Sequence, residues 1–284
     1  MPYLIPLLVA VALNTADRAL TRAALRRHSD RADHFLLVYQ LTSTLLTAPF
    51  ALHALLGPAH PISSLDTQAL LIALAAVTCW SVYSVSAFRS AALLELSVAA
   101  TISRLRLVLA AFFGVVLFGE TISPTHGVGL AVLLAAYIPL TRLPREQLHR
   151  KGLAYAALST LAITLALISD KALTTWLDPA VILFLGFAGT TLTSLVLNRG
   201  IKAAALRPVL LPAALAGTAG AAGYYGLLLA LAKGPVGVIL PVYQSSAFLY
   251  VLIGIVALGE TTGWRRKILS AAVSLLGTAL VLYG

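Results

Sequence analysis

Residues 91–120 read AALLELSVAATISRLRLVLAAFFGVVLFGE, an apolar run of membrane-spanning length that carries two arginines near its middle and ends in Gly119-Glu120. The same arrangement is found in residues 232–260, AKGPVGVILPVYQSSAFLYVLIGIVALGE, where Gly259-Glu260 repeats the Gly-Glu pair 140 residues later. A repeat on this scale indicates that the chain contains two copies of one design.

The composition places the chain in the membrane. Of its residues 60% are hydrophobic and 11% are charged, and its apolar runs of about 15 to 28 residues are long enough to cross a ~30 Å hydrocarbon core. The sequence therefore predicts an all-α integral membrane protein with ten transmembrane helices. These helices are expected over residues 3–25, 34–56, 67–88, 95–118, 126–141, 152–173, 179–197, 209–232, 236–258 and 265–283.

A second match between distant segments of the sequence supports a division of the chain into two repeated halves. Residues 17–21 read Asp-Arg-Ala-Leu-Thr, and residues 170–174 read Asp-Lys-Ala-Leu-Thr. We expect one five-helix repeat over residues 1–145 and another over 150–284. Because five is an odd number, the second repeat enters the membrane in the opposite sense, as in the inverted repeats of secondary transporters. The first helix has no basic residues before it, so we interpret it as a retained helix and not as a signal peptide.

Basic residues are distributed unevenly between the predicted loops. Fifteen fall in the loops after helices 1, 3, 5, 7 and 9, whereas Lys171 and Lys233 alone lie on the other side. The positive-inside rule then places the odd loops in the cytoplasm and both termini outside. Anionic lipid at one membrane face explains the net charge of +10 better than nucleic acid does.

A helix rich in small residues follows Gly-Glu in each half, with Gly127-Val128-Gly129-Leu130 in the first and Leu276-Gly277 in the second. With the five-plus-five arrangement, this pattern resembles the EamA family of the drug/metabolite transporter superfamily over essentially the whole chain. The resemblance implies transport of amino acids or other small metabolites, a central cavity lined by helices 1, 3, 4, 6, 8 and 9, and cytoplasmic termini.

Two positions differ from the pattern of that family. Asn14-Thr15 stands where the first helix often has an aromatic-glycine pair. Thr101 stands where the fourth helix often has a proline, which the second half keeps as Pro241. The resemblance therefore implies a class of protein and no particular substrate.

Charges inside the predicted helices indicate where a site lies. Arg104 and Arg106 are near the middle of the fourth helix, where an unpaired arginine costs from about 3 to over 10 kcal/mol. Arg104 is the first candidate for substrate contact, with an ion pair to Asp17 as the structural alternative. Arg106 lies about 200° further round the helix, so we do not expect both arginines to face one cavity, and bonds to backbone carbonyls or a lipid phosphate are its structural alternative.

The first helix carries a polar stripe of Asn14, Asp17, Arg18 and Thr21 at spacings of three and four residues, which predicts a face toward the bundle interior. The buried cations outnumber the carboxylates, which favours an anionic or carboxylate-bearing substrate. Asp17 and Asp170 are candidates for proton coupling, with local pairing as the alternative.

Other polar and aromatic positions complete the candidate site. Gln244 occupies the place of Arg104 in the second repeat and is predicted to line the cavity. Aromatic side chains that lie too deep for an interfacial belt either line the cavity or pack in the core. They are Trp80, Tyr83, Tyr224, Tyr225 and Tyr243. Small residues of the eighth helix, among them Gly217, Gly220 and Gly223, predict close helix contact.

Several classes of protein are disfavoured. The chain has no Gly-x-x-x-x-Gly-Lys-Ser/Thr loop, no catalytic constellation and no histidine spacing that suits a metal, so we predict neither an enzyme nor a cofactor. Glu120 and Glu260 are interpreted as capping and turn-anchoring residues. Cys79 stands alone and is interpreted as a core residue.

The sequence thus predicts a secondary active transporter of a small polar metabolite, an amino acid or an organic anion, in the inner (plasma) membrane, as a monomer or homodimer. An exporter of lipophilic cations and a flippase for lipid-linked substrates are the alternatives. Substrate identity, direction and coupling ion are left open.

Overall fold

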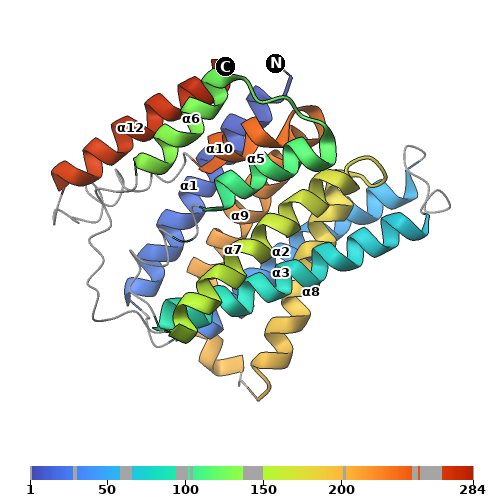
Figure 1. Ribbon diagram of the computed structural model, residues 1–284. Helices are drawn as coiled ribbons and strands as arrows, with labels where there is room; N and C mark the ends of the chain where they lie inside the picture. The colour runs from blue at the N-terminus through green and yellow to red at the C-terminus, as the bar shows by residue number, and fades with distance from the viewer. Residues whose placement is uncertain are drawn as a thin grey trace. The chain divides into compact units, whose positions relative to one another are not determined.

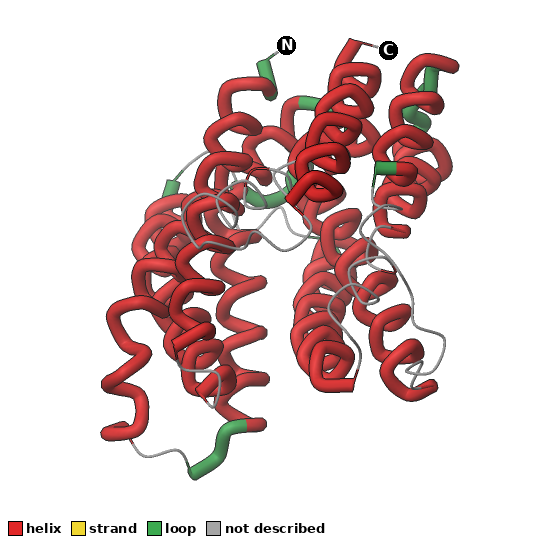
Figure 2. Tube along the Cα trace, turned by 90° about the vertical axis from the view of Figure 1, so that its left-hand side faces the viewer, coloured by secondary structure: helices red, strands yellow, loops and turns green. Residues whose placement is uncertain are grey.

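The computed structural model describes residues 2–27, 31–57, 66–93, 102, 105–136, 150–200, 203–244, 249 and 264–283. Of the described residues, 91% are helical and none lie in strands, as the tube in Figure 2 shows. The helices are α1 (Leu4–Arg27), α2 (Ala32–Leu56), α3 (Thr67–Leu93), α5 (Leu105–Phe118), α6 (Pro124–Ala135), α7 (Arg150–Leu173), α8 (Pro179–Leu197), η5 (Ala203–Leu206), α9 (Arg207–Lys233), α10 (Val236–Gln244) and α12 (Trp264–Tyr283). The prediction of an all-helical protein is confirmed.

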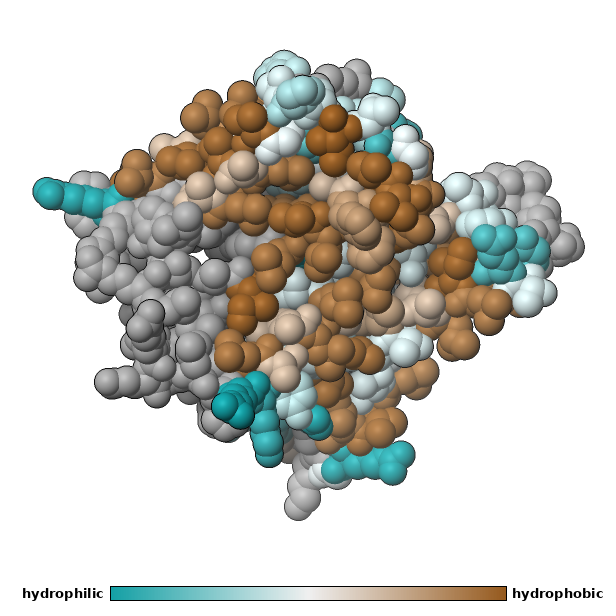
Figure 3. Space-filling model, viewed as in Figure 1, coloured by the Kyte–Doolittle hydropathy of each residue, from teal (hydrophilic) through white to brown (hydrophobic). Residues whose placement is uncertain are grey.

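Six of the described helical segments are long and apolar enough to cross a membrane, and α5 and α6 are shorter apolar helices. Many exposed side chains on these helices are large and hydrophobic, for example Phe50 at 64% and Leu211 at 68% exposure. Brown, hydrophobic atoms accordingly dominate the surface in Figure 3. In water such side chains would be unfavourable, whereas in a bilayer they face lipid tails. The helices thus have the surface of a multi-pass membrane protein.

Local signals explain where several helices begin. Ser123 caps α6 by accepting a hydrogen bond from the His126 N–H at 3.0 Å, with Pro124 in the first turn. Asp178 caps α8 in the same way, accepting from the Ala180 N–H at 2.8 Å. Such caps satisfy backbone donors that the first turn leaves free. The predicted start at Ser123-Pro124 is confirmed, and the predicted bounds 179–197 coincide with α8.

The chain divides into two compact units. Unit 1 comprises Met1–Thr78 and Ser169–Lys233, and unit 2 comprises Cys79–Ile168 and Gly234–Gly284. The helices α3 and α7 each contribute to both units. Each unit therefore contains segments from both halves of the sequence.

In unit 1 the glycines of α9 bring it close to α1 and α2. A Cβ on Gly217 would lie 2.7 Å from the Tyr39 carbonyl oxygen of α2. Further along α9, a Cβ on Gly223 would lie 3.1 Å from the Asn14 backbone nitrogen of α1, and one on Gly226 would lie 2.9 Å from the Pro6 carbonyl oxygen. Figure 1 shows α1 and α9 alongside each other. The predicted close helix contact is confirmed, because only small residues permit such an approach.

A seam of hydroxyl and amide groups joins α2 to α8 in unit 1. The Thr190 hydroxyl donates to Gln40 Oε1 at 2.9 Å, and the hydroxyls of Thr44 and Thr191 lie 2.8 Å apart. All but Thr44 of these four side chains are buried. Bonds of this kind hold helices together where hydrophobic burial cannot, since lipid tails are as apolar as the helices.

Removing one bond of this seam is expected to cost little. Thr191→Val keeps the shape of the side chain and leaves Thr44 bonded to the Gln40 carbonyl at 2.9 Å. We expect a loss of about 0.6 kcal/mol in unfolding free energy, the average for interhelical bonds in membranes, measured by denaturant titration in mixed micelles. Thr218→Val is the control, because the exposed Thr218 hydroxyl bonds only within α9. Equal losses in the two variants would show that the Thr44–Thr191 bond contributes nothing.

In unit 2, α5 packs against α10 and α6 packs against α12. The pair α6–α12 lies at the upper left in Figure 1 and crosses at two glycines that face each other's backbone. A Cβ on Gly129 would lie 2.9 Å from the Gly277 carbonyl oxygen, and one on Gly277 would lie 3.0 Å from that of Gly129. One turn further on, Leu133 and Val281 are the side chains that each Cβ would meet. The contact is therefore reciprocal.

Candidate functional site

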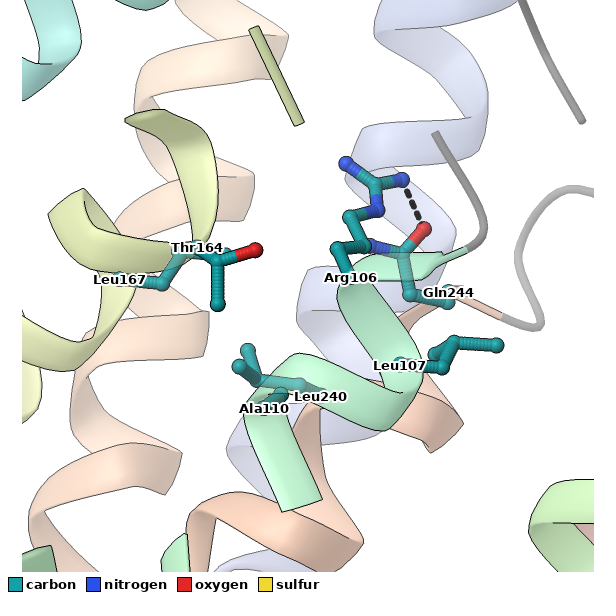
Figure 4. A pocket seen from close by; sticks show the side chains of 7 residues that line it. All are labelled: Arg106, Leu107, Ala110, Thr164, Leu167, Leu240 and Gln244. Atoms are coloured by element: carbon teal, nitrogen blue, oxygen red, sulfur yellow. Dashed lines mark hydrogen bonds between the residues drawn. The ribbon is translucent and has the colours of Figure 1, made fainter. Parts of the chain in front are cut away.

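A narrow hollow lies within unit 2, between α5, α7 and α10, and in this structure it is too small to hold a water molecule. Four of its lining residues are apolar and three are polar, and Figure 4 shows how they face one another. The lining consists of Arg106, Leu107, Ala110, Thr164, Leu167, Leu240 and Gln244. Its lining has the apolar wall and the few polar groups that small-molecule sites have, but such sites are larger, so a ligand would require these helices to move apart.

The polar end of the hollow is formed by Arg106 of α5 and Gln244 of α10. The Arg106 guanidinium donates a hydrogen bond from Nη2 to Gln244 Oε1, drawn as a dashed line in Figure 4. Gln244 is 8% exposed, and Arg106 is half-buried. The amide is neutral, so this hydrogen bond is not an ion pair. The arrangement suits an anionic group that would add a stronger, charge-assisted bond.

This geometry changes the ranking of the two arginines. Arg104, the first candidate from the sequence, lies outside the described residues. Arg106 bonds the Gln244 side chain and lines the hollow. Its structural alternative, a bond to backbone carbonyls or to a lipid phosphate, stays a prediction. Gln244 borders this hollow, and its predicted place in a central cavity stays a prediction.

Thr164 of α7 adds a third polar group. It is 1% exposed, and its hydroxyl donates to the Thr160 carbonyl oxygen at 2.7 Å. The oxygen points toward the interior of the hollow in Figure 4, where its remaining lone pair can accept a hydrogen bond. Leu107, Leu167 and Leu240 complete an apolar wall. The hollow thus offers one cation, one amide and one acceptor beside hydrocarbon.

Asp17 forms a separate buried polar cluster in unit 1. The side chain is 5% exposed by residue, and its Oδ1 accepts from the Thr21 hydroxyl at 3.2 Å. Tyr39 of α2 also hydrogen-bonds the carboxylate, and α9 approaches here, since a Cβ on Gly220 would lie 3.4 Å from Asp17 Cγ. The predicted inward face of Asp17 is confirmed.

The neighbouring Arg18 does not share that face. Its side chain is 55% exposed, and its Nε lies 4.0 Å from Asp17 Oδ2. The prediction that Arg18 lines the bundle interior is therefore wrong. Consecutive helical residues point about 100° apart, so burying Asp17 turns Arg18 outward, where its long stem permits the charge to reach a polar surface. Asn14 is half-buried and its backbone is close to Gly223.

Asp170 is the second buried carboxylate of unit 1, at 2% exposure. The Tyr224 hydroxyl of α9 donates to its Oδ2, and the adjacent Lys171 donates from Nζ to the Leu231 carbonyl oxygen, also of α9. Tyr224 was predicted to line a cavity or pack in the core, and its described contact is with this carboxylate. Both aspartates of the sequence repeat are thus bonded by a tyrosine hydroxyl.

Tyr225 of unit 1 is exposed, and three further aromatic candidates belong to unit 2. Trp80 and Tyr83 of α3 stack edge to face with ring centroids 5.8 Å apart, which is a packing arrangement. Tyr243 is a half-buried neighbour of Gln244 on α10. None of the three is among the residues that line the hollow.

Glu120 binds the beginning of α10. Its two carboxylate oxygens accept from the backbone N–H groups of Val236 and Gly237 at 2.6 and 2.8 Å. Gly119, with φ of +64°, reverses the chain after α5 and lets the Glu120 N–H reach the Gly114 carbonyl at 3.1 Å. Only glycine adopts this conformation at no cost. The predicted capping role of Glu120 is confirmed, but the capped helix lies more than a hundred residues away.

His126 also contacts the beginning of α10, and the sequence did not indicate such a role for it. It is 5% exposed, and its Nε2 lies 3.0 Å from the Gly237 carbonyl oxygen. It therefore ties α6 to the first turn of α10. Within the described ranges, no group of histidine, cysteine and carboxylate side chains could hold a metal ion.

A solved crystal structure of a protein has the same fold as this chain. The match has a TM-score of 0.76 at 16% sequence identity and covers 99% of this chain and 97% of the other. No protein-family model matches the chain, and no curated protein matches its sequence. The comparisons therefore establish a shared fold, and they assign neither a family nor a substrate.

Proposed function

We propose that this chain is a secondary active transporter of the EamA type, which moves a small carboxylate-bearing metabolite across the inner membrane by alternating access. The observation that carries the proposal is the Arg106–Gln244 pair at the polar end of a membrane-embedded hollow. A guanidinium inside an apolar helix is expensive, and such residues mark substrate or ion pathways in membrane proteins.

Helix pairing supports an inverted repeat as the framework of this transporter. Counted along the chain, α6 and α12 are the last predicted helices of the two halves, and they meet at Gly129 and Gly277, which are 148 residues apart. The helices α5 and α10 correspond to the fourth predicted helix of each half, and they also pack together. Equivalent helices that pair in this way are expected around the pseudo-twofold axis of a transporter with inverted repeats.

Binding of a substrate carboxylate would replace the hydrogen bond between Arg106 and Gln244. In this structure Arg106 bonds the neutral Gln244 oxygen. A substrate carboxylate offers the guanidinium two parallel, charge-assisted bonds, which are about twice as strong as bonds to a neutral acceptor. The Gln244 amide would then be free to turn its N–H₂ toward the substrate. Leu107, Leu167 and Leu240 would contact an apolar substituent.

A thermal-shift panel on the purified protein tests the proposal. Organic carboxylates, zwitterionic amino acids and lipophilic cations are compared at one ionic strength, since a ligand of the folded state raises the unfolding midpoint. We expect carboxylates or amino acids to stabilise the wild type and to lose this effect in Arg106→Gln. Uptake of the best ligand into proteoliposomes should fall at least about tenfold, the loss expected for a bidentate charge contact. Arg199→Gln, an exposed arginine after α8, should leave both unchanged.

A second variant separates loss of the site from loss of the fold. Gln244→Glu places a carboxylate beside Arg106, which would pair with it permanently and compete with any anionic substrate. We expect a folded protein that no carboxylate stabilises. Undiminished stabilisation in both Arg106→Gln and Gln244→Glu would refute the proposed site.

Export of lipophilic cations is the second candidate, because Asp17 and Asp170 are buried carboxylates within the helices of unit 1. Against it, both carboxylates already accept hydrogen bonds from tyrosine side chains. In the same panel, stabilisation by cations alone would favour this function, and Asp17→Asn should then abolish it.

A further inference from the structure

We propose that unit 2 carries a binding site for the headgroup of an anionic phospholipid, where α3 ends and α7 begins. The site consists of Arg89 near the end of α3, and of Arg150, Lys151 and Tyr155 in the first turns of α7. It is distinct from the hollow at Arg106 and does not depend on the transported substrate. In Figure 1 the two helix ends meet at the lower left, and in the same view Figure 3 shows hydrophilic side chains near the start of α7.

Arg89 is held in place by the Tyr155 side chain. Its guanidinium carbon lies 5.7 Å from the centre of the Tyr155 ring, and its Nη1 donates to the Tyr155 hydroxyl at 3.4 Å. The first distance is within the range of a cation–π contact. These contacts use one face and one N–H of the guanidinium, and the residue is exposed. Most of its five donors therefore remain available to a ligand outside the protein.

Lys151 and Tyr155 are one helical turn apart and share a face of α7. Arg89 lies over the Tyr155 ring, so Lys151 and Arg89 lie on the same side of α7. Arg150 and Lys151 are exposed, and no carboxylate occupies the first turn of α7. Arg89, Lys151 and Tyr155 thus share one side of α7, and Arg150 adds an exposed cation in the first turn of the same helix.

Charge and location together favour a lipid phosphate as the occupant. Residues 85–95 and 142–151 contain five basic residues and two acidic ones, which gives +3 for these segments. The helices on either side are apolar enough to cross a bilayer, so their ends lie at the depth of the headgroups. Basic sites between transmembrane helices bind anionic headgroups, and tyrosine is enriched at that depth. A site for a soluble anion would not require apolar, membrane-spanning helices on both sides of it.

The test compares lipid nanodiscs of pure phosphatidylcholine with nanodiscs that contain phosphatidylglycerol. We expect phosphatidylglycerol to raise the unfolding midpoint of the wild type, and native mass spectrometry to detect a retained phosphatidylglycerol molecule. Arg89→Gln combined with Lys151→Gln should abolish most of both effects. Arg207→Gln combined with Arg199→Gln, which removes two exposed charges from unit 1, should preserve them.

Two results would overturn the proposal. One is an equal response to phosphatidylglycerol in the Arg89→Gln/Lys151→Gln variant. The other is a rise of the same size when inorganic phosphate is added to protein in phosphatidylcholine nanodiscs, which would make this a site for a soluble anion. Tyr155→Phe distinguishes a built site from a diffuse attraction, because it keeps every charge. We expect it to weaken phosphatidylglycerol retention, whereas a purely diffuse attraction would leave retention unchanged.

Discussion

Gly129→Ala is expected to lower the free energy of unfolding by about 3 kcal/mol, at the upper end of the cost of overpacking. The added Cβ would lie 2.8 Å from the Val281 backbone nitrogen and 2.9 Å from the Gly277 carbonyl oxygen. Both are backbone atoms of α12, so no side-chain rotation can relieve the collision. The helices α6 and α12 would have to separate, and close packing is what holds helices together in a membrane. Equilibrium unfolding in mixed micelles measures the loss.

Gly127→Ala is the matched control for this prediction. Gly127 lies on the same helix two residues earlier, is exposed, and has nothing within 4 Å of a Cβ added to it. Because alanine forms helix better than glycine, this variant should be neutral or slightly stabilising, by up to about 1 kcal/mol. The reciprocal Gly277→Ala should resemble Gly129→Ala, since its Cβ would meet the Leu133 backbone nitrogen at 2.9 Å. Equal stability of the Gly129 and Gly127 variants would show that α6 and α12 do not cross at these glycines.

Most of the helices could be predicted from the sequence because hydropathy and capping are local properties. The predicted helix over 179–197 has the bounds of α8, and the glycines of α9 make the close contacts that their spacing indicated. The 3-10 turn η5 before α9 was not predicted, since it lies in a short apolar loop without a capping signal. The count of ten helices and the inversion of the two halves stay predictions, as parts of the fourth and ninth helices lie outside the described residues.

The candidate site was harder to predict because it depends on the rotation of each helix and on distant partners. The sequence placed two arginines in one helix, and a step of two residues turns a side chain to nearly the opposite face. Packing of α5 on α10 gives Arg106 the Gln244 partner. The polar seam of unit 1 did have a sequence signal. Gln40, Thr44 and Thr47 recur at helical spacing on α2.

Glu120→Ala is expected to lower the unfolding free energy by about 3 kcal/mol, since hydrogen bonds to a charged group contribute more than neutral ones and a lost cap costs about 1 kcal/mol or more. The carboxylate is the acceptor for the Val236 and Gly237 N–H groups, and alanine would leave both without it. Gly114 and Gly237 leave the room that this carboxylate fills, as a Cβ on Gly114 would lie 2.5 Å from Glu120 Oε2. Alanine would therefore leave a void as well.

Glu120→Gln should be intermediate, because one amide oxygen can still accept while the N–H₂ group faces the second backbone donor. Thr121→Ala, at the exposed adjacent position, is the control and should have almost no effect. Hydrogen–deuterium exchange localises the change: amide exchange at Val236 and Gly237 should accelerate in Glu120→Ala. Because Gln244 ends the same helix, a loosened α10 should also weaken any stabilisation by carboxylates that depends on Arg106. Unchanged exchange at the start of α10 would mean that this helix is fixed by its packing against α5 and α12, and that the recurring Gly-Glu serves only the turn after α5.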